Sequence, residues 1–274
     1  MNPSTGTGLF TAIVFALGVA ALAGTSESVA QDPAAQTSPE NTPADTAPAE
    51  PAATMAPAAK PPAYRDLRRI TRLRGDPAAG KAKSELCAAC HGAAGISIAP
   101  NFPNLAGQRA EYLYWELVEY QSGAMPESAM TPLAASLNDQ DMRDLALYYA
   151  SLPAGRAPAQ EEAPAPDTAL LERGRQLFME GDPGKGLPPC QGCHGADAGG
   201  HPLAARDDRD GHAPWSAYPS LRGQNAIYLQ VRLNAFRTAQ LHHSTNDFVM
   251  GGVGQRLDDD TISALSAWLA AQGP

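Results

Sequence analysis

Two hexapeptides, CAACHG at residues 87–92 and CQGCHG at residues 190–195, contain all four cysteines of this 274-residue chain. In each of them two residues separate the cysteines, and a histidine and a glycine follow directly. A CxxC pair can form a disulfide, a redox-active dithiol, half of a zinc site or a haem attachment point. A zinc site gives no reason for both histidines to take the same following position. A thioredoxin-like dithiol requires a strand that leads into a helix, whereas the flanking segments indicate helices or loops.

Covalent haem attachment explains all three residue types together. Two thioether bonds to the vinyl groups of the porphyrin need cysteines about one helical turn apart, and the next residue then lies over the iron. The histidines that follow the two pairs, His91 and His194, are therefore the predicted proximal ligands of two irons. The sequence predicts two covalently bound haem c groups, attached through Cys87, Cys90, Cys190 and Cys193.

The first thirty residues indicate export. An apolar run from Leu9 to Ala23 ends in small residues and is typical of a secretory signal, although no Lys or Arg precedes it. The run is shorter than the ~20 residues that span a bilayer comfortably, yet its length leaves an uncleaved anchor open. We interpret residues 1–30 as a signal peptide or an N-terminal anchor. We therefore expect a periplasmic protein, soluble after cleavage or tethered to the inner membrane.

Composition divides the rest of the chain into two folded regions. Residues 31–63 are built mainly from Ala, Pro, Thr and acidic or amide residues. Such a segment cannot bury enough apolar surface to offset its loss of conformational entropy, so we expect a disordered spacer. Residues 154–167 have a similar composition and are predicted to link two domains, at 64–153 and 168–274. Each domain falls within the usual range of about 50–200 residues.

The charge distribution argues against one class of partner and singles out one segment. A formal net charge of −9 gives no support to nucleic-acid binding. The charge is reversed locally at residues 64–83, which carry seven basic residues against two acidic ones. Leu67, Ile70 and Leu73 stand there at every third position, which predicts an amphipathic helix. Its basic face is either a solvated surface or a docking surface for an acidic partner or an anionic lipid.

The segments that follow the two motifs repeat each other. NFPNLAGQRAEYLYWELVEY at residues 101–120 and AYPSLRGQNAIYLQVRLNAF at residues 217–236 share identical residues at a constant offset of 116. The cysteines are offset by only 103, so the second copy carries thirteen additional residues, within 199–217. A repeat that extends so far beyond the motif indicates two copies of one haem domain. Six of the matching pairs are Pro103 and Pro219, Leu105 and Leu221, Gly107 and Gly223, Gln108 and Gln224, Tyr112 and Tyr228, and Leu113 and Leu229.

A methionine in each copy is the predicted sixth ligand of the iron. Met130 and Met250 are each followed seven residues later by a leucine and then by an apolar helix, so they occupy equivalent positions. Thioether sulfur opposite histidine gives a haem with a raised reduction potential. Met125 competes with Met130 in the same loop, but only Met130 keeps the spacing of the repeat. Four other histidines are interpreted as loop residues, with a ligand exchange left open for the last two: His201, His212, His242 and His243.

Together these features resemble the dihaem class I cytochromes c of the cytochrome c4 family. The resemblance covers residues 78–152 and 168–273 and rests on the CxxCHG motifs, the P-[NS]-L-x-G-Q segments, the Y-L pairs, the loop methionines and the last helices. It implies an all-α fold of two tandem class I cytochrome c domains, each wrapped around one covalently bound haem c. It also implies packing about an approximate twofold axis, with the propionate edges of the haems facing one another.

The family pattern further implies two contacts in each domain. The carbonyl of a proline downstream of the motif holds the N–H of the proximal imidazole and so fixes the ring and its donor strength. Pro103 and Pro219 occupy these positions. A glycine of the first helix packs against an aromatic residue of the last helix. The corresponding pairs are Gly80 with Tyr148 and Gly174 with Trp268.

An iron that is ligated on both sides has no open position for a substrate, so the sequence predicts an electron carrier without catalytic residues. The resemblance implies that it shuttles single electrons between a quinol-oxidising cytochrome complex or a dehydrogenase and a terminal oxidase or another acceptor. One alternative is a cytochrome subunit of a periplasmic dehydrogenase complex. Another is a dihaem enzyme, such as a peroxidase or a thiosulfate-oxidising cytochrome, which needs one open or unusual iron.

Overall fold

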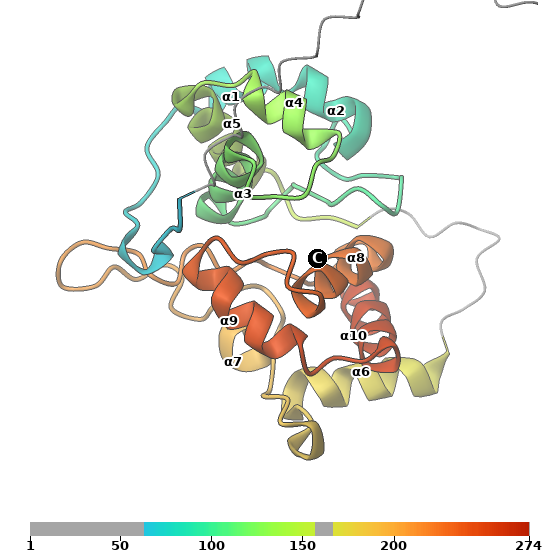
Figure 1. Ribbon diagram of the computed structural model, residues 1–274. Helices are drawn as coiled ribbons and strands as arrows, with labels where there is room; N and C mark the ends of the chain where they lie inside the picture. The colour runs from blue at the N-terminus through green and yellow to red at the C-terminus, as the bar shows by residue number, and fades with distance from the viewer. Residues whose placement is uncertain (1–62, 157–166, 274) are drawn as a thin grey trace, which may run out of the picture. The chain divides into compact units, whose positions relative to one another are not determined.

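The structure is a computed structural model that describes residues 63–156 and 167–273 (Figure 1). These residues belong to one compact unit, Pro57–Pro274. They form ten α-helices and two short 3-10 helices without a β-strand, so the predicted all-α fold is confirmed. None of these described helices has the length and apolar character needed to cross a membrane. The predicted signal or anchor segment at 1–30 and most of the predicted spacer and linker lie outside the described residues.

The first domain is built around its last helix. That helix, α5, packs against α1 and α3, and α3 also packs against α4. Apolar side chains of α3 and α5 form the core between them. The five helices are α1 (Pro77–Lys83), α2 (Glu85–His91), α3 (Ala110–Ser122), α4 (Met130–Ala135) and α5 (Asp139–Ser151).

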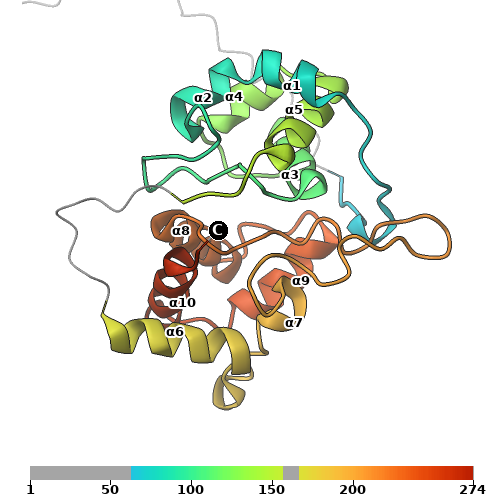
Figure 2. The same cartoon turned by 180° about the vertical axis from the view of Figure 1, so that it is seen from behind.

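The second domain repeats this arrangement. Its last helix, α10, packs against α6 and α8, and α8 also packs against α9. Figures 1 and 2 show α6 and α10 crossing. The order of the packed helices is therefore the same in both halves, as the sequence repeat predicts. The elements are α6 (Thr168–Glu180), the 3-10 turn η2 (Pro183–Lys185), α7 (Gln191–His194), α8 (Ala226–Arg237), α9 (Thr245–Gly254) and α10 (Asp259–Ala271).

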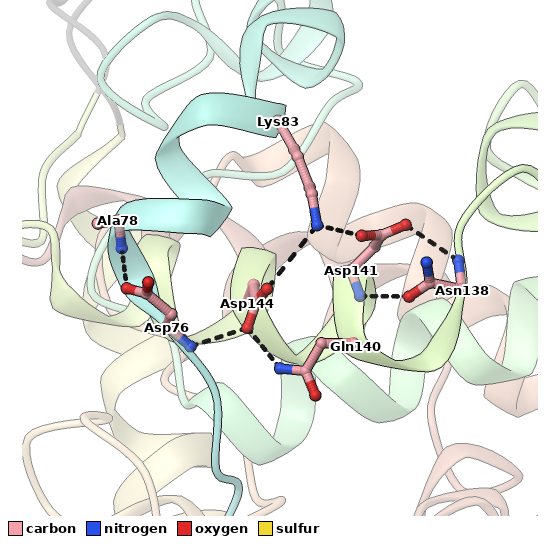
Figure 3. Close-up of polar contacts among 7 residues, drawn as sticks. All are labelled: Asp76, Ala78, Lys83, Asn138, Gln140, Asp141 and Asp144. Carbon is pink, nitrogen blue, oxygen red and sulfur yellow. Dashed lines mark hydrogen bonds and ion pairs between the residues drawn. The ribbon is translucent and has the colours of Figure 1, made fainter.

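Polar side chains tie the start of α1 to α5 (Figure 3). The side chain of Asp76 accepts a hydrogen bond from the N–H of Ala78 at 2.8 Å and so caps α1. Asp144 of α5 is buried, and it accepts hydrogen bonds from the N–H of Asp76 at 2.8 Å and from Nε2 of Gln140 at 2.7 Å. The Nζ atom of Lys83 lies 3.8 Å from the same carboxylate. These bonds fix α1 on α5 directly before the first CxxCH motif.

A glycine lets the first and last helices of each domain approach closely. A Cβ atom at Gly80 would lie 2.1 Å from the carbonyl oxygen of Asp144 and 2.9 Å from Cβ of Tyr148. A Cβ atom at Gly174 would lie 2.6 Å from Cβ of Trp268. Real Cβ atoms do not come so close to other atoms, so both crossings require glycine. The structure therefore shows both of the glycine–aromatic contacts that the resemblance implies.

The prediction of an amphipathic helix at residues 64–83 is wrong for residues 64–76, and only residues 77–83 are helical, as α1. Only a 3-10 turn, η1 (Leu67–Arg69), forms before α1, and residues 70–76 have no regular secondary structure. Two of the apolar residues at every third position, Leu67 and Ile70, are nevertheless buried, and Leu73 is half-buried. Leu67 and Ile70 form a small cluster with Ala217 of the second domain, and Trp115 packs against it. The apolar spacing thus reflects a tertiary contact rather than one face of a helix.

Backbone groups of the same segment are bonded to the second domain. The N–H of Arg65 donates to the carbonyl of His243 at 2.8 Å, and the N–H of Ala213 donates to the carbonyl of Ile70 at 2.7 Å. Since buried backbone groups need partners, these bonds replace those that a helix would provide. His243 and Ala213 lie in the two regions where the second copy is enlarged, 240–249 and 199–217.

The helix crossing of the second domain gives a test of its packing. Gly174→Ala should lower the free energy of unfolding of the haem-loaded protein by about 1–3 kcal/mol, because the new methyl group would lie 2.1 Å from the carbonyl oxygen of Ala264. Gly252→Ala in α9 is the matched control, since a Cβ atom there meets nothing within 4 Å and alanine favours a helix by about 1 kcal/mol. Denaturant titration measures both variants. Unchanged stability of the Gly174→Ala protein would contradict the close crossing.

Candidate haem sites

The first CxxCH motif forms a single short helix. Helix α2 contains Cys87, Cys90 and His91, and the imidazole is buried beneath the chain that follows. The Nδ1 atom of His91 lies 2.9 Å from the carbonyl oxygen of Pro103. A carbonyl oxygen can only accept a hydrogen bond, so Nδ1 carries the proton and Nε2 keeps its lone pair. The structure thus brings His91 and Pro103 together in the arrangement that orients an iron-binding imidazole.

The second motif gives the same arrangement in a different helix, α7. The Nδ1 atom of His194 lies 3.2 Å from the carbonyl oxygen of Pro219. Its Nε2 atom is buried and has no hydrogen-bond partner among the described residues. Burial lowers the pKa of both His194 and His91 and keeps the rings neutral, which is the form that binds a metal. A buried polar atom without a partner is costly unless a ligand engages it.

A largely apolar cavity lies beside His194, and Met250 of α9 also lines it. The cavity therefore contains both of the second-domain residues predicted to bind iron, together with apolar walls suited to a porphyrin. The unpaired Nε2 atom and this lining fit a haem. The apolar walls include Leu221, Leu229, Leu233, Phe236 and Leu269.

The cysteines have the character expected of haem attachment rather than of a dithiol centre. All four are free of disulfide bonds. Burial raises the pKa of the Cys87 thiol and raises that of Cys190 to about 11. Redox-active dithiols depend on a lowered pKa, which makes the thiolate available near neutral pH. The surroundings of Cys87 and Cys190 thus argue against thiol exchange as the role of these motifs.

The glycine of each CxxCHG motif has a structural role that the sequence did not reveal. Gly92 and Gly195 adopt φ angles of 78° and 79°, in the left-handed region that favours glycine. A Cβ atom at Gly92 would lie 2.1 Å from the carbonyl oxygen of Ile96, and one at Gly195 would lie 2.6 Å from that of Gly200. The chain therefore turns sharply after each histidine. The repeated His-Gly pair was the available signal.

The two candidate methionines of the first domain occupy different surroundings. Met130 is half-buried at the start of α4. Met125 is buried, and its Sδ atom lies 3.4 Å from Nη1 of Arg232 in α8. The sulfur of Met125 thus already contacts the second domain. The structure gives no direct contact between Met130 and His91, so the ligand of the first iron stays a prediction.

The four remaining histidines have partners of their own among the described residues or lie beside one another. His201 stacks on Trp215 with ring centroids 4.4 Å apart. His212 pairs with Asp208 at 3.1 Å. None of the four lines that cavity as the described residues form it. His242 is bonded to the carbonyl of Ala239, and His243 lies beside His242. Their interpretation as loop residues stays a prediction.

Two glutamines at equivalent positions of the repeat join the domains reciprocally. Gln108 donates from Nε2 to the carbonyl of Ser220 at 2.9 Å and accepts from the N–H of the same residue at 2.8 Å. Gln224 donates to the carbonyl of Asn104 at 3.0 Å and accepts from its N–H at 2.8 Å. The repeat singled out both glutamines, but their partners lie in the other domain and left no signal in the sequence.

An ion pair between equivalent positions of the repeat also joins the two domains. Glu116 of α3 and Arg232 of α8 approach to 2.8 Å, and both side chains are largely buried. Burial raises the pKa of Glu116, while Arg232 opposes the change. Burial together with Glu116 and Asp247 raises the pKa of the neighbouring Glu119 to about 8. These carboxyl groups and Arg232 line the cavity beside His194.

Comparisons with known proteins identify similar chains. The cytochrome c family model matches residues 77–153 and 171–272. Cytochrome c4 of Thiocapsa roseopersicina is 38% identical over 196 residues, which are 71% of this chain and 92% of the relative. The thiosulfate dehydrogenase electron acceptor of Stutzerimonas stutzeri strain A1501 is 33% identical over 195 residues, 68% of this chain and 79% of the relative.

Among solved structures, reduced recombinant cytochrome c4 from Pseudomonas stutzeri is similar, with a TM-score of 0.57 and 35% sequence identity. The match covers 73% of this chain and 100% of that chain. Both halves of the chain therefore have counterparts in proteins that share its two-domain plan.

The raised pKa of Glu119 predicts a pH dependence of stability. An unfolded glutamate ionises near pH 4.3. In the folded protein the pKa of Glu119 is raised to about 8. Its contribution to the free energy of unfolding is therefore fully present below the pKa of the unfolded state and is lost as the pH rises towards 8. Glu119→Gln should therefore reduce the loss of stability between pH 5 and pH 8 by about 2 kcal/mol.

Denaturant unfolding of the haem-loaded protein at the two pH values measures this effect. Glu127→Gln provides the matched control, because Glu127 is exposed in the loop before α4. Identical pH profiles for the parent and the Glu119→Gln variant would show that Glu119 ionises normally in the folded protein.

Proposed function

Because the chain belongs to the cytochrome c family, and within it to the cytochrome c4 proteins, we propose that it passes single electrons between periplasmic redox partners. It is an electron carrier with two covalently bound haem c groups, one for each CxxCH pair. Each haem, when bound, supplies a centre that gains or loses one electron. The observation that carries the proposal is the pair of buried, neutral imidazoles, His91 and His194, each held at Nδ1 by a proline carbonyl.

The same geometry supports a specific ligand set. In this set His91 and Met130 would hold the first iron, and His194 and Met250 would hold the second. The unpaired Nε2 atom of His194 and the presence of Met250 in the same cavity support the second pair. The equivalent position of Met130 in the repeat supports the first. The thioethers form at Cys87, Cys90, Cys190 and Cys193, and Pro103 and Pro219 orient the imidazoles.

This ligand set restricts what the protein can do. Two protein ligands on each iron leave no coordination position for a substrate, so only electrons pass. The apolar walls around His194 would favour the less charged reduced state of a haem bound there. The domains at 64–153 and 168–274 each contribute one centre, and the bonds of Gln108 and Gln224 hold the two together.

The periplasmic location rests on the signal-like segment at residues 1–30. A role as the electron acceptor of a dehydrogenase is a second candidate, because the similar protein of Stutzerimonas stutzeri carries the name thiosulfate dehydrogenase electron acceptor. In both cases the protein accepts electrons one at a time and passes them on, and the two candidates differ in the donor.

Substitution of the methionines tests the ligands. Met250→Ala should convert one of the two haems to the high-spin state and lower its potential, because the thioether that stabilises the reduced iron is lost. Met179→Ala is the control for the second domain, since Met179 lies in α6 and packs against the core. Met130→Ala should do the same to the first haem, whereas Met125→Ala should not. Visible and near-infrared spectra report both changes, and a low-spin Met250→Ala protein would refute that ligand.

Electron transfer from a dehydrogenase tests the second candidate. Thiosulfate and catalytic amounts of a thiosulfate dehydrogenase should reduce the oxidised protein, with growth of the reduced haem bands in a rapid-mixing experiment. Thiosulfate without the dehydrogenase is the control and should leave the protein oxidised. Absence of enzyme-dependent reduction would remove thiosulfate dehydrogenase as the donor and leave the general carrier role intact.

A further inference from the structure

We propose that Gln108 and Gln224 are positioning residues, each of which tunes the proximal histidine of the other domain through one shared peptide group. The proposal rests on the proposed function, in which His91 and His194 ligate the irons. It adds that the reduction potential of each haem depends on a side chain of the opposite domain. No chemistry beyond one-electron transfer is required.

The peptide group between Pro103 and Asn104 connects the first histidine to the second domain. Its carbonyl oxygen, on Pro103, accepts the hydrogen bond from Nδ1 of His91 at 2.9 Å. Its N–H, on Asn104, donates to Oε1 of Gln224 at 2.8 Å. One peptide group therefore lies between the imidazole of the first domain and the carboxamide of the second.

The peptide group between Pro219 and Ser220 makes the reciprocal connection. Its carbonyl oxygen lies 3.2 Å from Nδ1 of His194, and its N–H donates to Oε1 of Gln108 at 2.8 Å. The two connections involve equivalent positions of the repeat. The first has the shorter bond to histidine, so we expect the stronger effect on the first haem.

The glutamines are held firmly enough to act in this way. Both are buried, with 7% of Gln108 and 6% of Gln224 exposed. The Oε1 atom of each also accepts the next backbone N–H, that of Arg109 or Asn225, at 2.9 Å. Their Nε2 atoms donate to Ser220 and Asn104, as described above. Every polar atom of the two carboxamides thus has a partner, so each amide keeps one orientation.

Polarisation gives the direction of the effect. When the N–H of a peptide group donates a hydrogen bond, its carbonyl becomes a better acceptor, and linked bonds strengthen one another by about 10–30%. A stronger bond from Nδ1 makes the imidazole a better electron donor to a metal at Nε2. A stronger donor favours the oxidised iron and lowers the potential. Removal of the Gln224 acceptor should therefore raise the potential of the first haem.

Because the arrangement is reciprocal, the reduction potentials of both haems depend on the contact between the two domains. Loss or distortion of the contact would weaken both connections and raise both potentials together. A partner that shifts one domain against the other would change the driving force for electron transfer without touching a ligand. The contact between the domains is in this sense part of each redox site.

The test is a redox titration of the haem-loaded protein followed by NMR, which resolves the haem methyl signals of the two centres. Gln224→Leu should shift the one-electron equilibrium of the first haem about threefold towards reduction, roughly 30 mV at 59 mV per tenfold change. The second haem should move less. Gln108→Leu should produce the opposite pattern, with the larger shift at the second haem. The proton on Nδ1 of the affected histidine should move upfield as its hydrogen bond weakens.

Asn225→Ala is the matched control. The Nδ2 atom of Asn225 donates to the carbonyl of Phe102 at 2.7 Å, so its loss removes a bond between the domains while leaving the Pro103–Asn104 peptide group untouched. The helix cap is unaffected, because this side chain makes no capping bond. The Asn225→Ala protein should keep both potentials. Equal shifts in the Asn225→Ala and Gln224→Leu proteins would show that a loosened contact causes them and would overturn the proposal.

Two results separate this proposal from the ligand assignment. Low-spin spectra of the Gln224→Leu and Gln108→Leu proteins establish that the ligands are in place and the domains folded. Unmoved potentials in such low-spin proteins would overturn the tuning role alone. A change of spin state in the Met250→Ala protein bears on the ligands and is independent of both glutamines.

Discussion

The hydrogen bond from Nδ1 of each proximal histidine to a proline carbonyl is the constraint on which the rest of the structure depends. It sets the tautomer, leaves Nε2 without a proton, and fixes the ring against rotation. The glycine after each histidine turns the chain, and the proline then returns its carbonyl to the imidazole. Gly80 and Gly174 let the first and last helices of each domain cross closely beside this unit.

The unit occurs twice in the chain, and the two copies bind each other through residues at equivalent positions. Equivalent positions hold identical residues where the contact is reciprocal, as with Gln108 and Gln224. They hold opposite charges where a single buried pair is formed, as with Glu116 and Arg232. A buried pair of this kind is costly to break, because either partner alone would leave an unpaired charge. These contacts therefore hold the two domains together.

The sequence predicted the parts of this account that depend on local patterns. The CxxCH motifs predicted the haem groups. The repeat with its offset of 116 residues predicted two helical domains in which Pro103 and Pro219 are equivalent. The prediction of an amphipathic helix failed at residues 64–76. Leu67 and Ile70 would have the same spacing whether they packed against a neighbouring helix or against the other domain. The glutamines were visible as repeated residues, but a bond to the other domain has no local signature. The prediction that Met130 is a ligand of the first iron rests on the repeat alone.

The central claim is that both irons are held by histidine on one side and methionine on the other, so that the protein transfers electrons and binds no substrate at iron. Carbon monoxide added to the fully reduced, haem-loaded protein tests this claim most directly, because it binds readily only to iron with an open or weakly held position. If both irons are ligated on two sides, the visible spectra of both haems should stay unchanged. Rapid formation of a carbon monoxide complex at either haem would contradict it and would indicate a site for a substrate.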